Sequence, residues 1–128
     1  MKYLKAYKIF ETLTTEVKSD IDNILLDLND EGIQTITLAF ENVVDYEEFK
    51  YMYLIKIYKS NDKSIRWADI KDVVNRILIY SNSCGAGNLD IEIDDGDQML
   101  YFDNVSTINH RDIPPGCDFF TIEIKFMI

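Results

Sequence analysis

The chain has 128 residues, a length that suits one domain and leaves no room for two of ordinary size. Its formal charge of −10 at pH 7 argues against direct nucleic-acid binding and against docking on anionic lipid, because both need patches of Lys and Arg. Apolar residues make up 47% of the sequence, enough for a sizeable core, but no apolar run approaches the length of a membrane span. We therefore expect a single domain over residues 1–128 with no membrane segment.

The first forty residues contain one ambiguous segment, one helix and one strand. Residues 2–11 fit either a helical face or a strand, since period alone does not separate the two in a short apolar segment. Apolar residues then recur at helical spacing from Val17 to Leu28, and Gly32 provides a helix stop. Alternation over residues 33–40 predicts a strand. One face of this strand holds Ile36, Leu38 and Phe40.

The longest run of aromatic and β-branched residues, from Phe49 to Lys59, predicts the strand around which the fold is organised. One set of alternate positions is apolar from Phe49 to Ile57, and Met52 and Leu54 keep the middle of the other set apolar as well. A strand that is apolar on both faces at mid-length lies in the interior of a sheet. We expect helices to cover the first face. That face holds Phe49, Tyr51, Tyr53, Ile55 and Ile57.

The second half of the chain predicts one more helix and three more strands. The helix runs from about Trp67 to Ser81, with an apolar stripe at helical spacing. Residues 89–94 alternate between apolar and acidic side chains, and Asp95-Gly96 is a strong hairpin signal before a returning strand over residues 98–103. The last strand covers residues 120–128. This order predicts an α+β fold with two helices packed on one face of a mainly antiparallel sheet. A strand within residues 2–11 would make it ferredoxin-like with an added C-terminal strand extension.

Two cysteine and histidine motifs resemble catalytic sites without meeting their requirements. His110-Arg111-Asp112 has the letters of a kinase catalytic loop, but the Asn required five positions later is Cys117. His110 and Cys117 could pair as base and nucleophile, but the acidic segment around them disfavours the thiolate that such a pair needs. We therefore predict no catalytic residue and no enzyme activity.

The sequence also lacks the residue spacing of the common metal sites. Cys84 and Cys117 are lone cysteines without the paired spacing of a zinc site. A calcium-binding EF-hand loop that starts at Asp90 needs Gly at its sixth position, where the chain has Asp95. The sequence therefore predicts no metal and no cofactor, the alternative being a single weak cation site on the turn Asp94-Asp95-Gly96-Asp97.

Most of the acidity falls in one segment. Residues 84–118 contain eight acidic residues and one basic residue, Arg111, which gives a net charge of −7. Alternate residues of a strand share a face, so three of these carboxylates should point away from the core together. We expect this surface to bind a protein with a basic surface, the alternative being an ordinary solvated sheet face. The predicted partner-binding residues are Asp90, Glu92, Asp94, Asp95 and Asp97.

The first eleven residues, MKYLKAYKIFE, resemble the MKxLKxFE-type start of many short proteins of large tailed bacteriophages. Those proteins often continue, as here, into a helix that ends in an acidic turn with Gly, such as residues 27–32. This chain departs from the pattern by placing Tyr7-Lys8-Ile9 before Phe10. The group has no common activity, so the resemblance implies a phage origin and carries over no functional residue.

These observations together predict a small, acidic, non-enzymatic binding protein. A phage-encoded inhibitor of a host nucleic-acid-handling complex involved in defence would have these properties, because an acidic surface can compete with nucleic acid for a basic cleft. The main alternative is a structural or self-assembling phage protein that forms homo-oligomers through a sheet edge. A small enzyme with a loop-borne site is a further alternative. The start of the chain lacks the long apolar region of a secretion signal, so we expect a cytoplasmic location, in the host cytoplasm if a phage encodes the protein.

Overall fold

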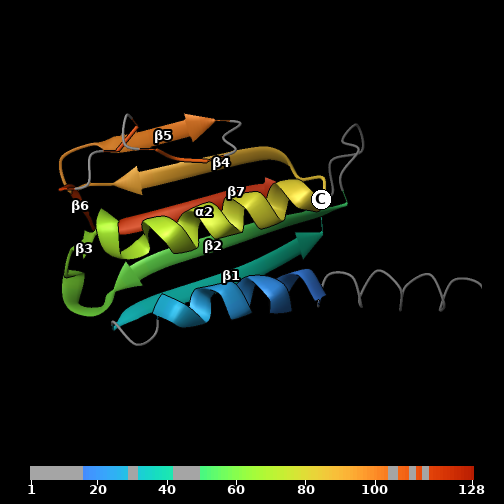
Figure 1. Ribbon diagram of the computed structural model, residues 1–128, viewed down its shortest axis with the longest axis horizontal. Helices are drawn as coiled ribbons and strands as arrows, with labels where there is room; N and C mark the ends of the chain where they lie inside the picture. Colours follow the sequence, from blue (N-terminus) through green and yellow to red (C-terminus); the bar gives the residue numbers. More distant parts are fainter. Residues whose placement is uncertain (1–15, 29–31, 42–49, 104–106, 110–111, 114–115) are drawn as a thin grey trace, which may run out of the picture.

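The protein forms an antiparallel sheet of five strands with two helices on one of its faces (Figure 1). The predicted α+β class, with helices on one face of a mainly antiparallel sheet, is therefore confirmed. The computed structural model describes residues 16–28, 32–41, 50–103, 107–109, 112–113 and 116–128.

The strands of the sheet follow the order β1-β2-β7-β4-β5, so the C-terminal strand lies in the middle. The strand predicted from residues 49–59 is β2, and it lies in the interior between β1 and β7, as expected. The ferredoxin-like variant depends on residues 2–11, which lie outside the described residues, and it is not confirmed. The five strands are β1 (Ile33–Glu41), β2 (Tyr51–Lys59), β4 (Gly87–Asp94), β5 (Met99–Asp103) and β7 (Thr121–Met127).

A second, two-stranded ladder joins the start of the second helix to the segment that precedes β7. Its strands pair Ile65 with Phe119, and the backbone N–H of Trp67 donates to the carbonyl of Cys117 at 2.9 Å. The Trp67 and Phe119 rings meet edge to face, with their centroids 6.0 Å apart. The alternation pattern of the sequence does not predict this ladder. The ladder consists of β3 (Ile65–Arg66) and β6 (Asp118–Phe119). The short helix η1 (Ser60–Asp62) precedes β3, and α2 (Trp67–Ser83) follows it.

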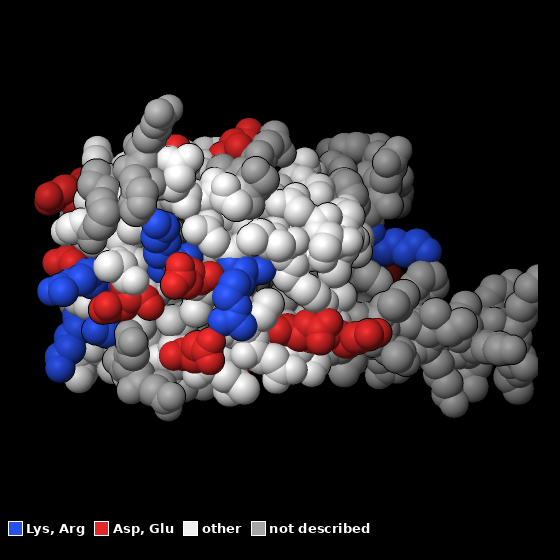
Figure 2. Space-filling model, in the orientation of Figure 1, with Lys and Arg blue, Asp and Glu red and all other residues white. Residues whose placement is uncertain are grey.

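The first helix, described over residues 16–28, lies beside α2 and runs in the opposite direction (Figure 1). Asp20 accepts a hydrogen bond from the Tyr80 hydroxyl at 2.7 Å, and Asp27 pairs with the Arg76 guanidinium at 2.7 Å. Asp20 precedes Asp27 whereas Tyr80 follows Arg76, so these two contacts require antiparallel helices. Figure 2 shows basic and acidic side chains interspersed over this helix-covered face.

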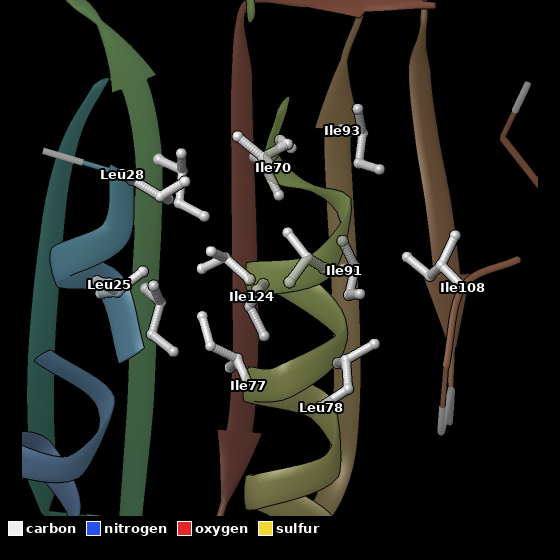
Figure 3. Packing of buried hydrophobic residues seen from close by; sticks show 14 of the residues in the cluster. Leu25, Leu28, Ile70, Ile77, Leu78, Ile91, Ile93, Ile108 and Ile124 are labelled. Atoms are coloured by element: carbon white, nitrogen blue, oxygen red, sulfur yellow. The ribbon is translucent and has the colours of Figure 1, made fainter. Parts of the chain in front are cut away.

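The core lies between the helices and the sheet (Figure 3). Ile55, Ile124 and Ile91 form one cross-strand row on β2, β7 and β4, and none of the three has exposed surface. The apolar stripes of both helices take part in this packing. Buried residues of these stripes include Leu25, Leu28, Val73, Val74 and Ile77, and Ile24 is partly buried.

The described part of the long connection between β5 and β6 is attached to α2. Ile108 and Ile113 are both buried in the core, and Figure 3 places Ile108 on the β5 side of the cluster, on the far side of Ile91 from Ile124. The Asn75 side chain bonds both backbone groups of Ile108, donating to its carbonyl at 3.0 Å and accepting from its N–H at 2.8 Å. This connection therefore extends the covered area of the sheet beyond the two helices.

Apart from Ile33 at its start, strand β1 presents small residues to the helices, and it presents large apolar residues to the opposite side. Directly paired residues of neighbouring strands point to the same face of the sheet. Thr37 pairs with Ile55 and Ala39 pairs with Tyr53, and the β2 residues Ile55 and Tyr53 are buried. Thr37 and Ala39 therefore face the first helix, and their small size lets that helix pack closely. The large side chains of Ile36, Leu38 and Phe40 share one face, as predicted, and each of these residues is 40–44% exposed.

Candidate protein-binding surface

The face of the sheet opposite the helices, here called the open face, carries the predicted acidic residues of β4. Leu89, Ile91 and Ile93 are buried on the helix side of this strand. The alternate residues Asp90, Glu92 and Asp94 therefore point to the open face, where no helix of the described chain lies (Figure 1).

Two neighbouring rows of paired residues cross the open face from β5 and β4, which carry most of the acidic side chains, to β2 and β1, which carry apolar side chains. A lysine lies between the acidic and the apolar residues in each row. In the strand order β5-β4-β7-β2-β1, one row is Asp103, Asp90, Lys125, Leu54 and Leu38. The neighbouring row is Tyr101, Glu92, Glu123, Lys56 and Ile36.

The open face therefore divides into two parts of different chemistry. The acidic half holds the carboxylates of Asp90, Glu92, Asp94, Asp103 and Glu123, together with the exposed Met99 and Tyr101 of β5. The apolar half consists of Ile36, Leu38, Phe40, Met52 and Leu54. The two halves lie side by side on one sheet, so a single partner could contact both.

Asp90 lies at the centre of the acidic half. Burial raises the pKa of Asp90, and the Asp103 carboxyl within hydrogen-bonding reach raises this pKa further, against smaller opposing effects of Tyr101 and Lys125. One carboxyl oxygen, Oδ1, is shielded from solvent and has no hydrogen-bond partner among the described residues. Glu92 lies directly opposite Glu123, which places two further like charges side by side. The acidic half is thus electrostatically unfavourable in the isolated protein.

Two of the predicted residues, Asp94 and Asp95, use their carboxylates to shape the hairpin turn. Asp95 Oδ1 accepts from the backbone N–H of Asp97 at 2.9 Å and of Gln98 at 2.7 Å, and these backbone bonds lower the pKa of Asp95. Asp94 Oδ1 accepts from the N–H of Gly96 at 2.9 Å. Gly96 has a φ of +96°, which other residues rarely adopt, and an added Cβ would lie 2.6 Å from a Phe120 ring carbon. The turn therefore fixes the end of the acidic half.

The structure adds Asp103 and Glu123 to the predicted acidic surface and gives Asp95 a local role. The turn bond from the Asp95 N–H to the Gln98 carbonyl sets a register in which Asp103 faces Asp90, so the hairpin signal could have located Asp103. Glu123 belongs to the surface only because β7 lies next to β4. No local sequence pattern predicts that neighbour.

The other residues considered in the sequence do not assemble into a site within the described chain. His110 and Arg111 lie outside the described residues. Cys117 is half-buried beside the two-stranded ladder, and Cys84 is half-buried at the end of α2. Among the described residues, no three His, Cys, Asp or Glu side chains are grouped as metal ligands, and none of the helices is long and apolar enough to span a membrane.

A groove of about 600 Å³ lies between the two helices, on the face shown in Figure 2. Its lining includes Asp69, Asp72 and the Asp27–Arg76 ion pair. Arg76 is paired with Asp27 across this groove and two further carboxylates line it, whereas the acidic half of the open face brings five carboxylates together. The open face is therefore the stronger candidate for a binding surface.

Comparison with known proteins adds no relative from which a function could be transferred. No protein-family model matches the chain, and no curated protein and no solved structure is significantly similar to it. The case for a function therefore depends on the chemistry of the open face.

Proposed function

We propose that this is a small, non-enzymatic binding protein whose acidic half engages a basic surface of another protein. The observation that carries the proposal is the environment of Asp90. Its shielded oxygen lacks a hydrogen-bond partner among the described residues, and Asp103 crowds it. A Lys or Arg side chain of a partner that binds the exposed carboxylates next to Asp90, those of Glu92 and Asp103, would relieve the repulsion. The isolated protein bears the cost of crowding, and binding would remove it.

The arrangement of charge supports a partner that normally binds nucleic acid. Alternate residues of β4 lie about 6.8 Å apart, so Asp90, Glu92 and Asp94 present a regular row of negative charge. A basic cleft that binds phosphates recognises such a row, and occupation by this protein would exclude the nucleic acid. Together with the phage-like N-terminal sequence, this favours a phage-encoded inhibitor of a host nucleic-acid-handling complex in the host cytoplasm.

A pair of variants tests the proposal by removing the same charge from opposite faces. Both lower the formal charge from −10 to −7 by neutralising three acidic residues. The acidic-half variant carries Asp90→Asn, Glu92→Gln and Asp103→Asn. The helix-face variant carries Glu16→Gln, Asp22→Asn and Asp72→Asn, at three exposed positions of the helices.

Each protein is used as bait in a bacterial lysate, and captured proteins are then challenged with duplex DNA and with RNA. We expect the wild type and the helix-face variant to capture the same basic protein, the acidic-half variant to lose it, and nucleic acid to displace it. Equal capture by all three baits would show that the acidic half is an ordinary solvated surface.

A further inference from the structure

Strand β1 forms one edge of the described sheet and lacks the features that normally keep sheet edges from pairing. It spans nine residues and pairs with β2 in continuous register, without a bulge. It contains no Pro, Gly, Lys or Arg, and its single charged residue, Glu41, is at its end. Long, regular and uncharged edge strands are rare in monomeric proteins because they accept another strand readily.

The opposite edge strand, β5, is shorter than β1 and lies among acidic residues. It has five residues, ends in Asp103, and lies next to the acidic residues of β4. The neighbouring ladder between β4 and β7 also has an irregular register between Gly87 and Asp90. The longer β1, which lies away from the acidic residues of β4, is therefore the edge better suited to pairing with a second copy.

We propose that β1 pairs in antiparallel orientation with β1 of a second copy of the chain, giving a two-fold symmetric, ten-stranded sheet. Alignment of the two strands on Leu38 places Ile36 opposite Phe40 of the second copy and Leu38 opposite itself. Each of the three exposed apolar side chains then gains an apolar cross-strand neighbour. Their present exposure follows from the absence of a neighbour on the outer side of β1 among the described strands.

The distribution of charge favours a second copy at this edge. Two chains of charge −10 repel each other, so a self-contact must keep their acidic regions apart. In the sheet order, β4 lies three strands from β1, and seven strand spacings would separate β4 from its counterpart in the dimer. At about 4.8 Å per spacing this is about 34 Å, several times the screening length of about 8 Å at physiological salt. Stacking of acidic halves or pairing of β5 edges would instead bring like charges together.

Sedimentation equilibrium of the full chain tests the proposal by comparing two variants, each with one lysine added to a different edge strand. Leu38→Lys places a charge at the centre of β1, and Met99→Lys places one at a similarly exposed position on β5. We expect the wild type and Met99→Lys to sediment at twice the 15.0 kDa mass of one chain, and Leu38→Lys to sediment as a single chain with an unchanged circular dichroism spectrum. A wild type that remains a single chain at its highest soluble concentration would overturn the proposal, and would leave β1 available to a strand of another protein.

A cross-linking variant tests the register and does not depend on the folding of Leu38→Lys. Directly opposed residues in antiparallel strands have Cα atoms about 4.5–5.5 Å apart, within the range that a disulfide spans. In a background with Cys84→Ser and Cys117→Ser, we expect Leu38→Cys to form a covalent dimer under mild oxidation and Met99→Cys to remain a single chain. Equal cross-linking at the two positions would contradict pairing through β1.

Discussion

Asp90 on β4 and Asp103 on β5 are direct cross-strand partners on the open face, with their carboxyl groups within hydrogen-bonding reach. Two carboxylates in this arrangement favour the retention of a proton, since ionisation of both places like charges together. Burial and Asp103 therefore both raise the pKa of Asp90. This pair of crowded carboxyl groups lies on the surface proposed to bind a basic partner.

Removal of the Asp103 charge should stabilise the protein at neutral pH. An Asp whose folded pKa is raised binds its proton more tightly in the folded than in the unfolded state, so stability falls as pH rises through the window above the unfolded value of 3.8. Asp103→Asn should remove part of this loss of stability, because it removes the charge that faces Asp90. We expect a gain of about 0.2–1 kcal/mol at neutral pH, and a smaller gain well below the unfolded pKa of 3.8, where Asp90 is protonated in both states. Urea unfolding of both proteins across this range measures the effect, and a gain independent of pH would contradict it.

The buried side chains of β2 should tolerate truncation poorly. Ile55 is fully buried between Thr37 and Ile124, so Ile55→Ala opens a cavity and should cost about 2–5 kcal/mol of unfolding free energy. Leu54→Ala, on the partly exposed open face of the same strand, is the matched control and should cost less. A change below about 0.5 kcal/mol for Ile55→Ala would show that β2 does not organise the core.

Thr37 offers a stabilising substitution. Its hydroxyl is buried on the helix side of β1 and has no hydrogen-bond partner among the described residues. Thr37→Val replaces the hydroxyl with a methyl group of similar size and should raise stability by about 1 kcal/mol, because an unsatisfied buried polar group is removed. Thr35→Val, half-buried on the same face, should change it less. Thermal unfolding compares the two variants, and destabilisation by Thr37→Val would indicate a partner for the hydroxyl.

The Asn75 side chain should hold the connection between β5 and β6 in place. Asn75→Ala removes two hydrogen bonds to Ile108 and should cost about 1–3 kcal/mol. The loss should be accompanied by faster hydrogen exchange at the Ile108 amide. Asn82→Ala, which removes a bond within α2 at an exposed position, is the control and should leave that amide unchanged. Unaltered exchange at Ile108 in the Asn75 variant would contradict the anchoring role.

Local patterns in the sequence predict the helices and strands of this fold better than they predict which strands lie next to each other in the sheet. The aromatic and β-branched run identified β2, and the alternation of Leu89, Ile91 and Ile93 predicted which side of β4 is buried. The position of β7 between β2 and β4 depends on pairing between distant segments, so Glu123 could not be assigned to the acidic half. Hydrophobicity alone would place Ile36 in the core, but the register with β2 and close packing of the first helix put small residues there instead.

The rate at which the captured partner associates with this protein tests the central claim most directly. Surface plasmon resonance at low and at physiological salt compares the wild type, the acidic-half variant and the helix-face variant. Charges that steer association act on its rate and are screened by salt. We predict that the acidic-half variant associates about tenfold or more slowly at low salt, that added salt narrows this difference, and that the helix-face variant behaves nearly as the wild type. Equal rates for all three proteins, unaffected by salt, would contradict a function based on the acidic half of the open face.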